Sequence, residues 1–308
     1  MSVMSSSRTR MVVNGVLLLD KPEGISSNFA LTVARQRLNA KKAGHTGTLD
    51  PFATGLLPVC FGEATKFAQD LLDADKTYEA TVHLGIRTAT GDTEGEVVAV
   101  QNASSVTRDQ VEAVLEHFVG DILQIPPMYS ALKRDGKPLY EYARAGIELE
   151  RHARPVTVHD LQILSFSSPY LALRIACSKG TYIRTLGEDI GHSLGCGAHL
   201  SALRRVRVGT LDIDDATTLA DLELAADPLN APFLKPVDYL LQSCFPVYLP
   251  DALARRFRHG QRLSVEKENL ELAGADGRVR VYERSSMTLL GTAAVVRGIL
   301  VPQRLVAL

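Results

Sequence analysis

The 308-residue sequence contains no tryptophan and only four cysteines. These cysteines, at positions 60, 177, 196 and 244, are scattered, and no two have the Cys-x-x-Cys spacing of a zinc ribbon or a redox motif. This usage excludes a disulfide framework and is typical of a cytoplasmic protein. No stretch of about 18 consecutive apolar residues is present, so the sequence predicts no membrane-spanning helix. Residues 1–10 lack the apolar core of a secretory signal and are expected to form a flexible tail.

The sequence also has no excess of charge of either sign. It carries 34 Lys and Arg against 35 Asp and Glu, a formal net charge of −1. Any basic face for a nucleic acid must therefore come from charge segregation. Arginines cluster at 204–207 and at 255–262, whereas residues 208–234 contain six acidic residues and no basic one. Either arginine cluster, taken alone, is equally compatible with ordinary solvated surface charge.

A metal site finds little support in the sequence. His192, Cys196 and His199 have a spacing that one helix face could bring together. However, Gly191, Gly195 and Gly197 interrupt such a helix, and a structural zinc site needs four ligands. We therefore expect no bound metal and no cofactor.

Length and hydrophobic patterning predict a mixed fold in two parts. A chain of this length with 45% apolar residues favours one large domain and one smaller domain. Apolar runs at 16–19 and 171–176 and strict alternation over 77–86 predict strands. Helices are expected after Ser26 or Ser27, with Phe29, Val33 and Leu38 on the apolar face, after the capping box at 107–110, and over 183–190. These elements follow no regular β-α repeat, which favours an α+β fold with a mixed, mainly antiparallel sheet.

A domain boundary is expected near residue 246, because proline density rises between 228 and 250 and short β-type runs follow. The predicted division is a tail at 1–10, a large domain at 11–245 and a small, mostly β domain at 246–308. Internal repeats are absent.

The segment from Gly44 to Gly55 is the most informative part of the chain, because its glycines and Pro51 enclose a single aspartate, Asp50. Pro51 biases Asp50 toward an extended conformation, and glycines permit close backbone approaches. The alternative is a surface Asp-Pro turn, in which the carboxylate bonds only its own backbone. The density of glycines favours an active-site loop. It is no P-loop, because it has no lysine, and no aspartyl-phosphate site, because Phe52 occupies the position of the second carboxylate.

The sequence resembles the bacterial TruB-type tRNA pseudouridine synthases, which isomerise the T-loop uridine conventionally numbered 55. The resemblance extends over roughly residues 14–210. It is carried by the motifs Asp20-Lys21-Pro22 with Gly24, Gly44 to Gly55, Gly62 to Lys66, Lys76-Thr77-Tyr78, Pro126 to Lys133, Gly136 to Arg144, and Cys177 to Arg184. It implies a pseudouridine-synthase catalytic domain at 11–245, a PUA-like RNA-binding domain at 246–308, and tRNA, through its T-arm stem-loop, as the partner. It implies no membrane and no obligate protein partner.

The same resemblance implies three catalytic residues. Asp50 matches the essential aspartate, which attacks C1′ of the ribose or removes the 2′ proton; the sequence leaves both routes open. Arg184 matches the arginine that keeps the aspartate ionised, although a helix arginine is by itself more often solvent-paired. Tyr78 matches the residue that stacks on the flipped uracil and accepts the C5 proton, although a strand tyrosine is more often core.

Four further residues match substrate-binding positions. His45 corresponds to a histidine that enters the T-loop stack, and Tyr182 and Leu203 correspond to walls of the uridine pocket. Lys21 corresponds to a basic residue near the loop that supports structure or the RNA backbone. Each could instead be an ordinary loop or core contact. Cations expected at phosphates are Lys133, Arg134, Lys137 and Arg144.

Two other functions share these features. A related synthase acts on ribosomal RNA within a guide-RNA complex, but such proteins usually carry longer basic tails than residues 306–308 provide. A tRNA-folding chaperone would need the fold and the RNA affinity but not Asp50. The expected activity is thus a cytoplasmic tRNA pseudouridine synthase, with a chaperone or a synthase for another structured RNA as the alternative.

Overall fold

The computed structural model describes residues 9–227, 229, 232–270 and 277–307. Its helices are α1 (Ser27–Arg37), α2 (Ala68–Asp73), α3 (Arg108–Glu116), α4 (Leu139–Arg144), α5 (Ile183–Ser193), α6 (Leu219–Leu224) and α7 (Asp251–Arg258), with 3₁₀ turns η1 (Gly62–Phe67), η2 (Ile213–Asp215) and η3 (Val237–Leu241). Residues 1–8 of the expected tail lie outside the described residues. Within the described ranges, no helix is long and apolar enough to cross a membrane.

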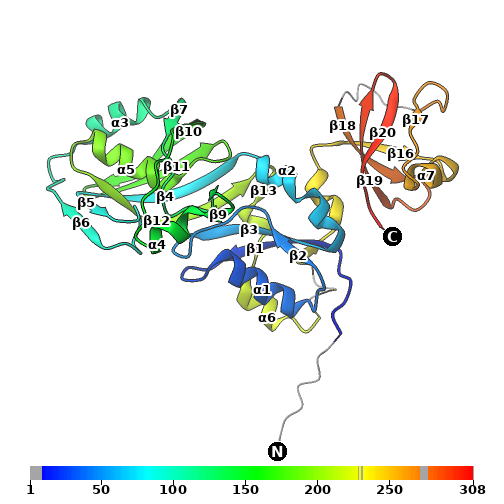
Figure 1. Ribbon diagram of the computed structural model, residues 1–308, viewed down its shortest axis with the longest axis horizontal. Helices are drawn as coiled ribbons and strands as arrows, with labels where there is room; N and C mark the ends of the chain where they lie inside the picture. The colour runs from blue at the N-terminus through cyan, green and yellow to red at the C-terminus, as the bar shows by residue number, and fades with distance from the viewer. Residues whose placement is uncertain (1–8, 228, 230–231, 271–276, 308) are drawn as a thin grey trace, which may run out of the picture.

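The strands form two sheets and two hairpins (Figure 1). The larger sheet contains β1 (Gly15–Lys21), β2 (Ala43–His45), β3 (Thr54–Phe61), β4 (Lys76–Leu84), β7 (Gly120–Gln124), β10 (Arg154–Ser167), β11 (Tyr170–Cys177), β12 (Ala198–Val208), β13 (Leu211–Asp212), β14 (Thr217–Thr218) and β15 (Leu234–Lys235). The hairpins pair β5 (Ile86–Thr88) with β6 (Val97–Val100) and β8 (Lys133–Arg134) with β9 (Lys137–Pro138). The smaller sheet contains β16 (Phe245–Leu249), β17 (Leu263–Ser264), β18 (Gly277–Glu283), β19 (Leu289–Val296) and β20 (Ile299–Leu305).

The main path of the larger sheet runs β14-β1-β3-β12-β4-β11-β10-β7. Its pairs are antiparallel except for β1 with β14 and β3 with β12. The expected α+β class with a mixed, mainly antiparallel sheet is therefore confirmed. The parallel β3–β12 pair brings the end of the Asp50 loop beside the residues that follow Leu203.

Strands β1 and β3 read as continuous apolar runs because both of their faces are covered. Leu17, Leu19, Leu57 and Val59 point into a core that includes residues of α1, α3, α5 and α6. Their neighbours Val16, Leu18, Leu56 and Cys60 point into a second core under η1, α2 and η3. The sheet that carries the Asp50 loop is thus fixed from two sides.

The predicted helix starts are confirmed, but one predicted face is wrong. Ser26 caps α1 by accepting a hydrogen bond from the Phe29 N–H, and the capping box of Thr107 and Gln110 is formed in α3. The buried face of α1 consists of Ala30 and Ala34, followed by Leu38, whereas Phe29 is 56% exposed. The small alanines let α1 pack closely, and the large side chain remains outside.

The alternating strand predicted over 77–86 ends two residues early. The alternation holds as far as Leu84, and Ile86 begins the separate hairpin strand β5. Gly85 between them has φ +86°, and a Cβ at this position would lie 2.6 Å from the Gln101 carbonyl oxygen. The apolar and polar residues therefore keep alternating in the sequence across Gly85, although the strand itself ends before this glycine.

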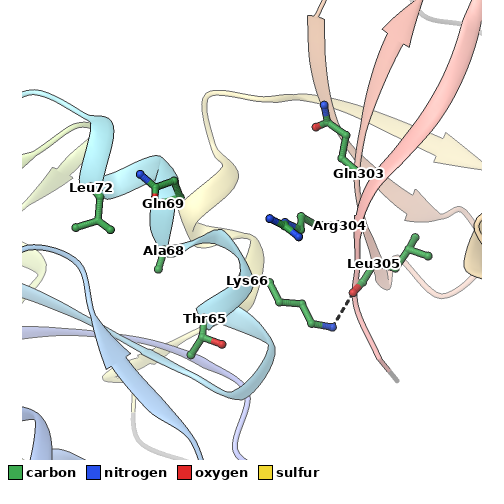
Figure 2. Close-up of a pocket in the computed structure, with 8 residues that line it drawn as sticks. All are labelled: Thr65, Lys66, Ala68, Gln69, Leu72, Gln303, Arg304 and Leu305. Carbon is green, nitrogen blue, oxygen red and sulfur yellow. Dashed lines mark hydrogen bonds between the residues drawn. The ribbon is translucent and has the colours of Figure 1, made fainter. Parts of the chain in front are cut away.

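The smaller sheet and α7 form a separate lobe at one end of the molecule (Figure 1). Polar contacts join it to η1 and α2: the Lys66 ammonium donates to the Leu305 carbonyl at 2.8 Å (Figure 2), and the Ala307 N–H donates to Glu63 at 2.6 Å. A groove of about 560 Å³ between the lobes is lined by Thr65, Lys66, Ala68, Gln69, Leu72, Gln303, Arg304 and Leu305. We propose the division between residues 245 and 246, which lies within one residue of the start of β16 at Phe245.

We predict that Gly55→Ala destabilises the protein. Gly55 has φ +101°, and a Cβ here would lie 2.3 Å from the Arg205 carbonyl oxygen. We expect the free energy of unfolding to fall by about 3 kcal/mol from strain and overpacking together. Urea unfolding measures the change. Gly24→Ala is the matched control, because Gly24 also has a positive φ, +81°, but nothing lies within 4 Å of its Cβ position. Equal losses in both variants would contradict the close-approach argument.

Candidate active site

Asp50 lines a pocket of about 270 Å³ on the larger domain. Five of the seven site residues predicted from the sequence line it: Asp50, Tyr78, Tyr182, Arg184 and Leu203. The remaining lining residues are Thr48, Leu49, Tyr129, Ser130, Ala131, Gly180, Thr181 and Ile183. The groove between the lobes is larger, but the cluster of an aspartate, an arginine and three tyrosines makes the Asp50 pocket the candidate for chemistry.

The backbone on both sides of Asp50 is tied to the start of α1. Before Asp50, the Leu49 N–H donates to the Ser27 hydroxyl at 2.7 Å, and that hydroxyl donates to the Leu49 carbonyl at 2.9 Å. After Asp50, the Pro51 carbonyl accepts from the Gly24 N–H at 2.8 Å and from the Lys21 ammonium at 3.2 Å. Asp50 is therefore held by its neighbours' main chain, which leaves its carboxylate free for the pocket.

Lys21, which was expected to support structure or the RNA backbone, lies inside the fold at the Asp50 loop. Its side chain is fully buried, and its ammonium donates to the carbonyls of Pro22 and Ile25, each at 2.8 Å, besides that of Pro51. Burial lowers the pKa of Lys21 to about 8, although nearby Asp50 raises it. Lys21 thus supports the loop from inside the fold.

Arg184, the second residue of α5, forms an ion pair with Asp50. The distance between its Nε and Asp50 Oδ2 is 3.0 Å, and its side chain is only 5% exposed. Burial raises the pKa of the Asp50 carboxyl above its ordinary value, and the Arg184 guanidinium opposes that rise. The arginine thereby favours the ionised carboxylate in a site that would otherwise favour the acid.

The sequence reasoning missed Asp92, which lies on the other side of Arg184. Its Oδ2 is 3.3 Å from Arg184 Nη1, and the residue is 2% exposed. Asp92 also accepts hydrogen bonds from the Thr90 hydroxyl and, at 3.0 Å, from the Glu94 N–H. The only sequence signal was an acidic, glycine-rich turn at 89–95 between two apolar runs.

Two backbone carbonyls complete the surroundings of Arg184. The carbonyl of Thr90 accepts from Nη1 at 3.0 Å, and that of Tyr129 accepts from Nη2 at 2.6 Å. With these carbonyls and the two carboxylates, the guanidinium has a partner on every nitrogen. Its rotamer is therefore fixed with Nε directed at Asp50.

Tyr78, Tyr182 and Leu203 form walls of the pocket. Tyr78 lies on β4 and Leu203 on the neighbouring β12, while Tyr182 precedes α5. Buried Gln124 holds the Tyr182 backbone by accepting from its N–H at 3.0 Å and donating to its carbonyl at 3.3 Å. Burial raises the pKa of both tyrosines, so their hydroxyls are protonated at neutral pH. The walls offer flat and apolar surfaces of the kind that receives a planar base.

His45 ends β2 and does not line the pocket. Burial, followed by the nearby Arg205, lowers the pKa of its imidazole, so the ring is uncharged at neutral pH. The cations expected at phosphates are exposed or half-buried on the β8–β9 hairpin and α4: Lys133, Arg134, Lys137 and Arg144. Among the described residues, no three His, Cys, Asp or Glu side chains are grouped to hold a metal, and His192, Cys196 and His199 form no such set.

Comparisons with known proteins find a family that matches almost the whole chain. The N-terminal domain of TruB family pseudouridylate synthases matches residues 35–183, the C-terminal domain of tRNA pseudouridylate synthase B matches 184–242, and the C-terminal part of pseudouridine synthase II TruB matches 246–306. The tRNA pseudouridine synthase B of Ralstonia pickettii is 57% identical over 310 residues, 97% of this chain and 96% of that protein. That of Burkholderia mallei is 57% identical over 299 residues, 96% and 98% of the two chains.

Solved structures show the same architecture. A Cbf5-Nop10-Gar1 complex contains a chain with a TM-score of 0.69 and 29% identity, covering 92% of this chain and 78% of that one. An H/ACA RNP bound to a substrate RNA containing 2′-deoxyuridine contains one with a TM-score of 0.72 and 24% identity, covering 96% and 86%, a likeness of fold. Fold and site together define a pseudouridylate synthase. Within that class, the chain belongs to the TruB family.

We predict that Arg184→Gln raises the pKa of Asp50. The substitution removes the cation that opposes the effect of burial and leaves the negative charge of Asp92 in place. The Asp50 carboxyl should therefore protonate at a higher pH than in the wild type. A pH titration of its ¹³C resonance, assigned with Asp50→Asn, measures the shift. Arg174→Gln is the control, because Arg174 pairs with Glu79 on the surface. An unchanged or lower Asp50 pKa would refute the electrostatic role of Arg184.

Proposed function

We propose that this protein converts the T-loop uridine of tRNAs, position 55, into pseudouridine. One observation carries the proposal: an ionisable aspartate, 3.0 Å from a buried arginine, faces a pocket walled by two tyrosines and a leucine. The activity in the printed names of relatives that are 57% identical over nearly the whole chain supports it.

The reaction begins with extrusion of the uridine from the RNA stack. Asp50 is 37% exposed at its side chain within a pocket, so a base inside a folded loop must be flipped out to reach it. Tyr78 and Tyr182 supply ring faces, and Leu203 an apolar wall, that replace the lost stacking. His45 is neutral and suited to occupy the place that the base leaves in the loop.

The chemistry detaches the base from C1′ and reattaches it through C5. The ionised Asp50 either bonds to C1′ as a nucleophile or removes the 2′ proton to give a glycal. Both routes need the ionised carboxylate, which the Arg184 guanidinium favours. After the base turns and its C5 bonds to C1′, the C5 proton must be removed. Tyr78 is the residue we assign to accept it.

A guide-RNA-dependent synthase for ribosomal RNA is the less well supported reading. The Cbf5-Nop10-Gar1 structure named above is a complex of several proteins, and its matching chain is 29% identical to this chain. The tRNA pseudouridine synthase B of Ralstonia pickettii is 57% identical and covers almost the full length. We therefore propose that the protein works without an obligate protein partner. A tRNA-folding chaperone activity would use the same surfaces and can coexist with the isomerase.

The RNA is proposed to approach with its T-arm across the hairpin of β8 and β9 and helix α4. Lys133, Arg134 and Arg144 on these elements are positioned for phosphate contacts, which fix orientation without reading sequence. We place the activity in the cytoplasm, since Cys60, Cys177, Cys196 and Cys244 are all free thiols.

We predict that Asp50→Asn abolishes isomerisation while RNA binding persists. The amide keeps the shape of the carboxylate but can neither attack C1′ nor accept the 2′ proton. Tritium release from C5-labelled T-arm stem-loop, run beside a filter-binding titration, gives both quantities. Asp109→Asn, an exposed change in α3, is the control and should match the wild type. Turnover by Asp50→Asn would contradict the assignment of Asp50 as the reacting carboxylate. If the variant loses both RNA binding and turnover, the role of Asp50 is structural.

We also predict that activity does not depend on a metal ion. The proposed chemistry uses a carboxylate, a guanidinium and a phenol only. Tritium release from pre-folded stem-loop should therefore proceed at the same rate in EDTA as in magnesium-free buffer. A loss of rate in EDTA that zinc or manganese restores, while RNA binding stays constant, would contradict this chemistry.

A further inference from the structure

Arg205 is a deeply buried cation beside the site, and no step above uses it. Its side chain is 1% exposed, although the residue lies on β12 between the surface arginines 204 and 207. Arg204 pairs with Asp20 and Arg207 with Asp212. Within the described residues, Arg205 has no carboxylate at ion-pair distance. Burying a guanidinium without a counter-ion costs free energy, which its hydrogen bonds must offset.

The side chain of Arg205 reaches two ends of the catalytic loop. Its Nε donates to the Leu56 carbonyl at 2.8 Å, just after the loop, and its Nη2 donates to the Gly47 carbonyl at 3.0 Å, just before Asp50. Gly47 has φ +96°, and a Cβ there would lie 3.4 Å from Arg205 Nη1. The guanidinium thus bridges the loop from behind.

The same guanidinium also reaches Tyr78. Its positive charge opposes the effect of burial, which is larger and raises the pKa of this tyrosine. The backbone places them together, because Arg205 is the register partner of Tyr78 on β4 and of Gly55 on β3. One residue therefore connects the Asp50 loop and Tyr78 through both its main chain and its side chain.

The other buried cations near the loop behave differently. Lys21 and Lys76 donate only to backbone carbonyls: Lys21 to three near the loop, and Lys76 to Leu71 at 3.0 Å, Leu72 at 2.8 Å and Ala74. Either can be understood as support for the fold. Arg205 alone among the three is the strand-register partner of a residue that lines the pocket, Tyr78.

We infer that Arg205 is a positioning residue for the isomerisation, which holds the Tyr78 oxygen in register with the Asp50 loop and stabilises negative charge on it. The inference rests on the proposed function. In the final step the C5–H bond breaks and its electron pair forms the C5–C6 double bond. Before this step the Tyr78 hydroxyl, which is protonated at neutral pH, gives its proton to water. The resulting phenolate oxygen then binds the C5 proton and becomes a hydroxyl again. A donor on a fixed cation favours the phenolate that this step needs.

The test is the C5 deuterium isotope effect on single-turnover pseudouridine formation, measured over pH with a T-arm stem-loop at saturating enzyme. We expect Arg205→Gln to slow the reaction about 100-fold, the size typical for loss of proton-transfer assistance. The isotope effect should increase, because proton removal becomes slower. The pH at which the rate rises should also be higher than in the wild type, because the Tyr78 pKa is higher without the cation. RNA affinity should be unchanged.

Arg205→Lys and Arg207→Lys complete the design. Arg205→Lys keeps the charge but not the planar fork, so it should show the same changes to a smaller degree. Arg207→Lys, on the same strand with a side chain 57% exposed, should match the wild type. The inference is overturned if either folded Arg205 variant is fully active, if its rate falls with an unchanged isotope effect and pH profile, or if Arg205→Lys does not fold. A wild-type protein that binds the stem-loop but forms no pseudouridine would instead refute the proposed function itself.

Discussion

The guanidinium of Arg184 is the contact on which the site depends. It joins the Asp50 loop, the Asp92 turn and the loop of Tyr129 to the start of α5, with distances of 2.6 to 3.3 Å. A cation in the first turn of a helix opposes the helix dipole. Two carboxylates and two carbonyls offset that cost, and the arginine can in turn favour the ionised form of a half-enclosed aspartate. The ion pair is therefore both an anchor between segments and the electrostatic condition for the proposed reaction.

The fold holds this pair by burying the machinery around it. Strands β1 and β3 are covered on both faces, and the loop between β2 and β3 is tied to Ser27 and Lys21 rather than to solvent. This rigid support benefits a carboxylate that must be positioned precisely at C1′, because small displacements lower the reaction rate strongly. The smaller lobe contacts the larger domain at η1 through Lys66 and Glu63, at α2 through Asp70 and at η3 through Asp238. None of these four residues lines the Asp50 pocket.

Local patterns were sufficient to predict the sheet class, the starts of α1, α3 and α5, and the Asp50 loop, because capping boxes, alternation and glycine-bounded turns act over a few residues. Asp92, Ser27 and Arg205 were not predicted. Their contacts cross 22 residues for Ser27 to Leu49, and 149 and 158 for Arg205 to Leu56 and Gly47. A pattern over a few neighbouring residues cannot indicate contacts between residues so far apart in the sequence. Lys21 was expected to support structure or the RNA backbone, but the sequence did not indicate the three carbonyls that enclose its ammonium.

The central claim is that this pocket isomerises one uridine in the T-loop of tRNA. Nucleotide-resolved mapping of pseudouridine in a full-length, unmodified tRNA transcript, after incubation with the purified protein alone, tests it most directly. We expect a single new pseudouridine at position 55, and none when the T-loop uridine is replaced by cytidine. Pseudouridine at other positions only, or none in RNA that the protein binds, would contradict it.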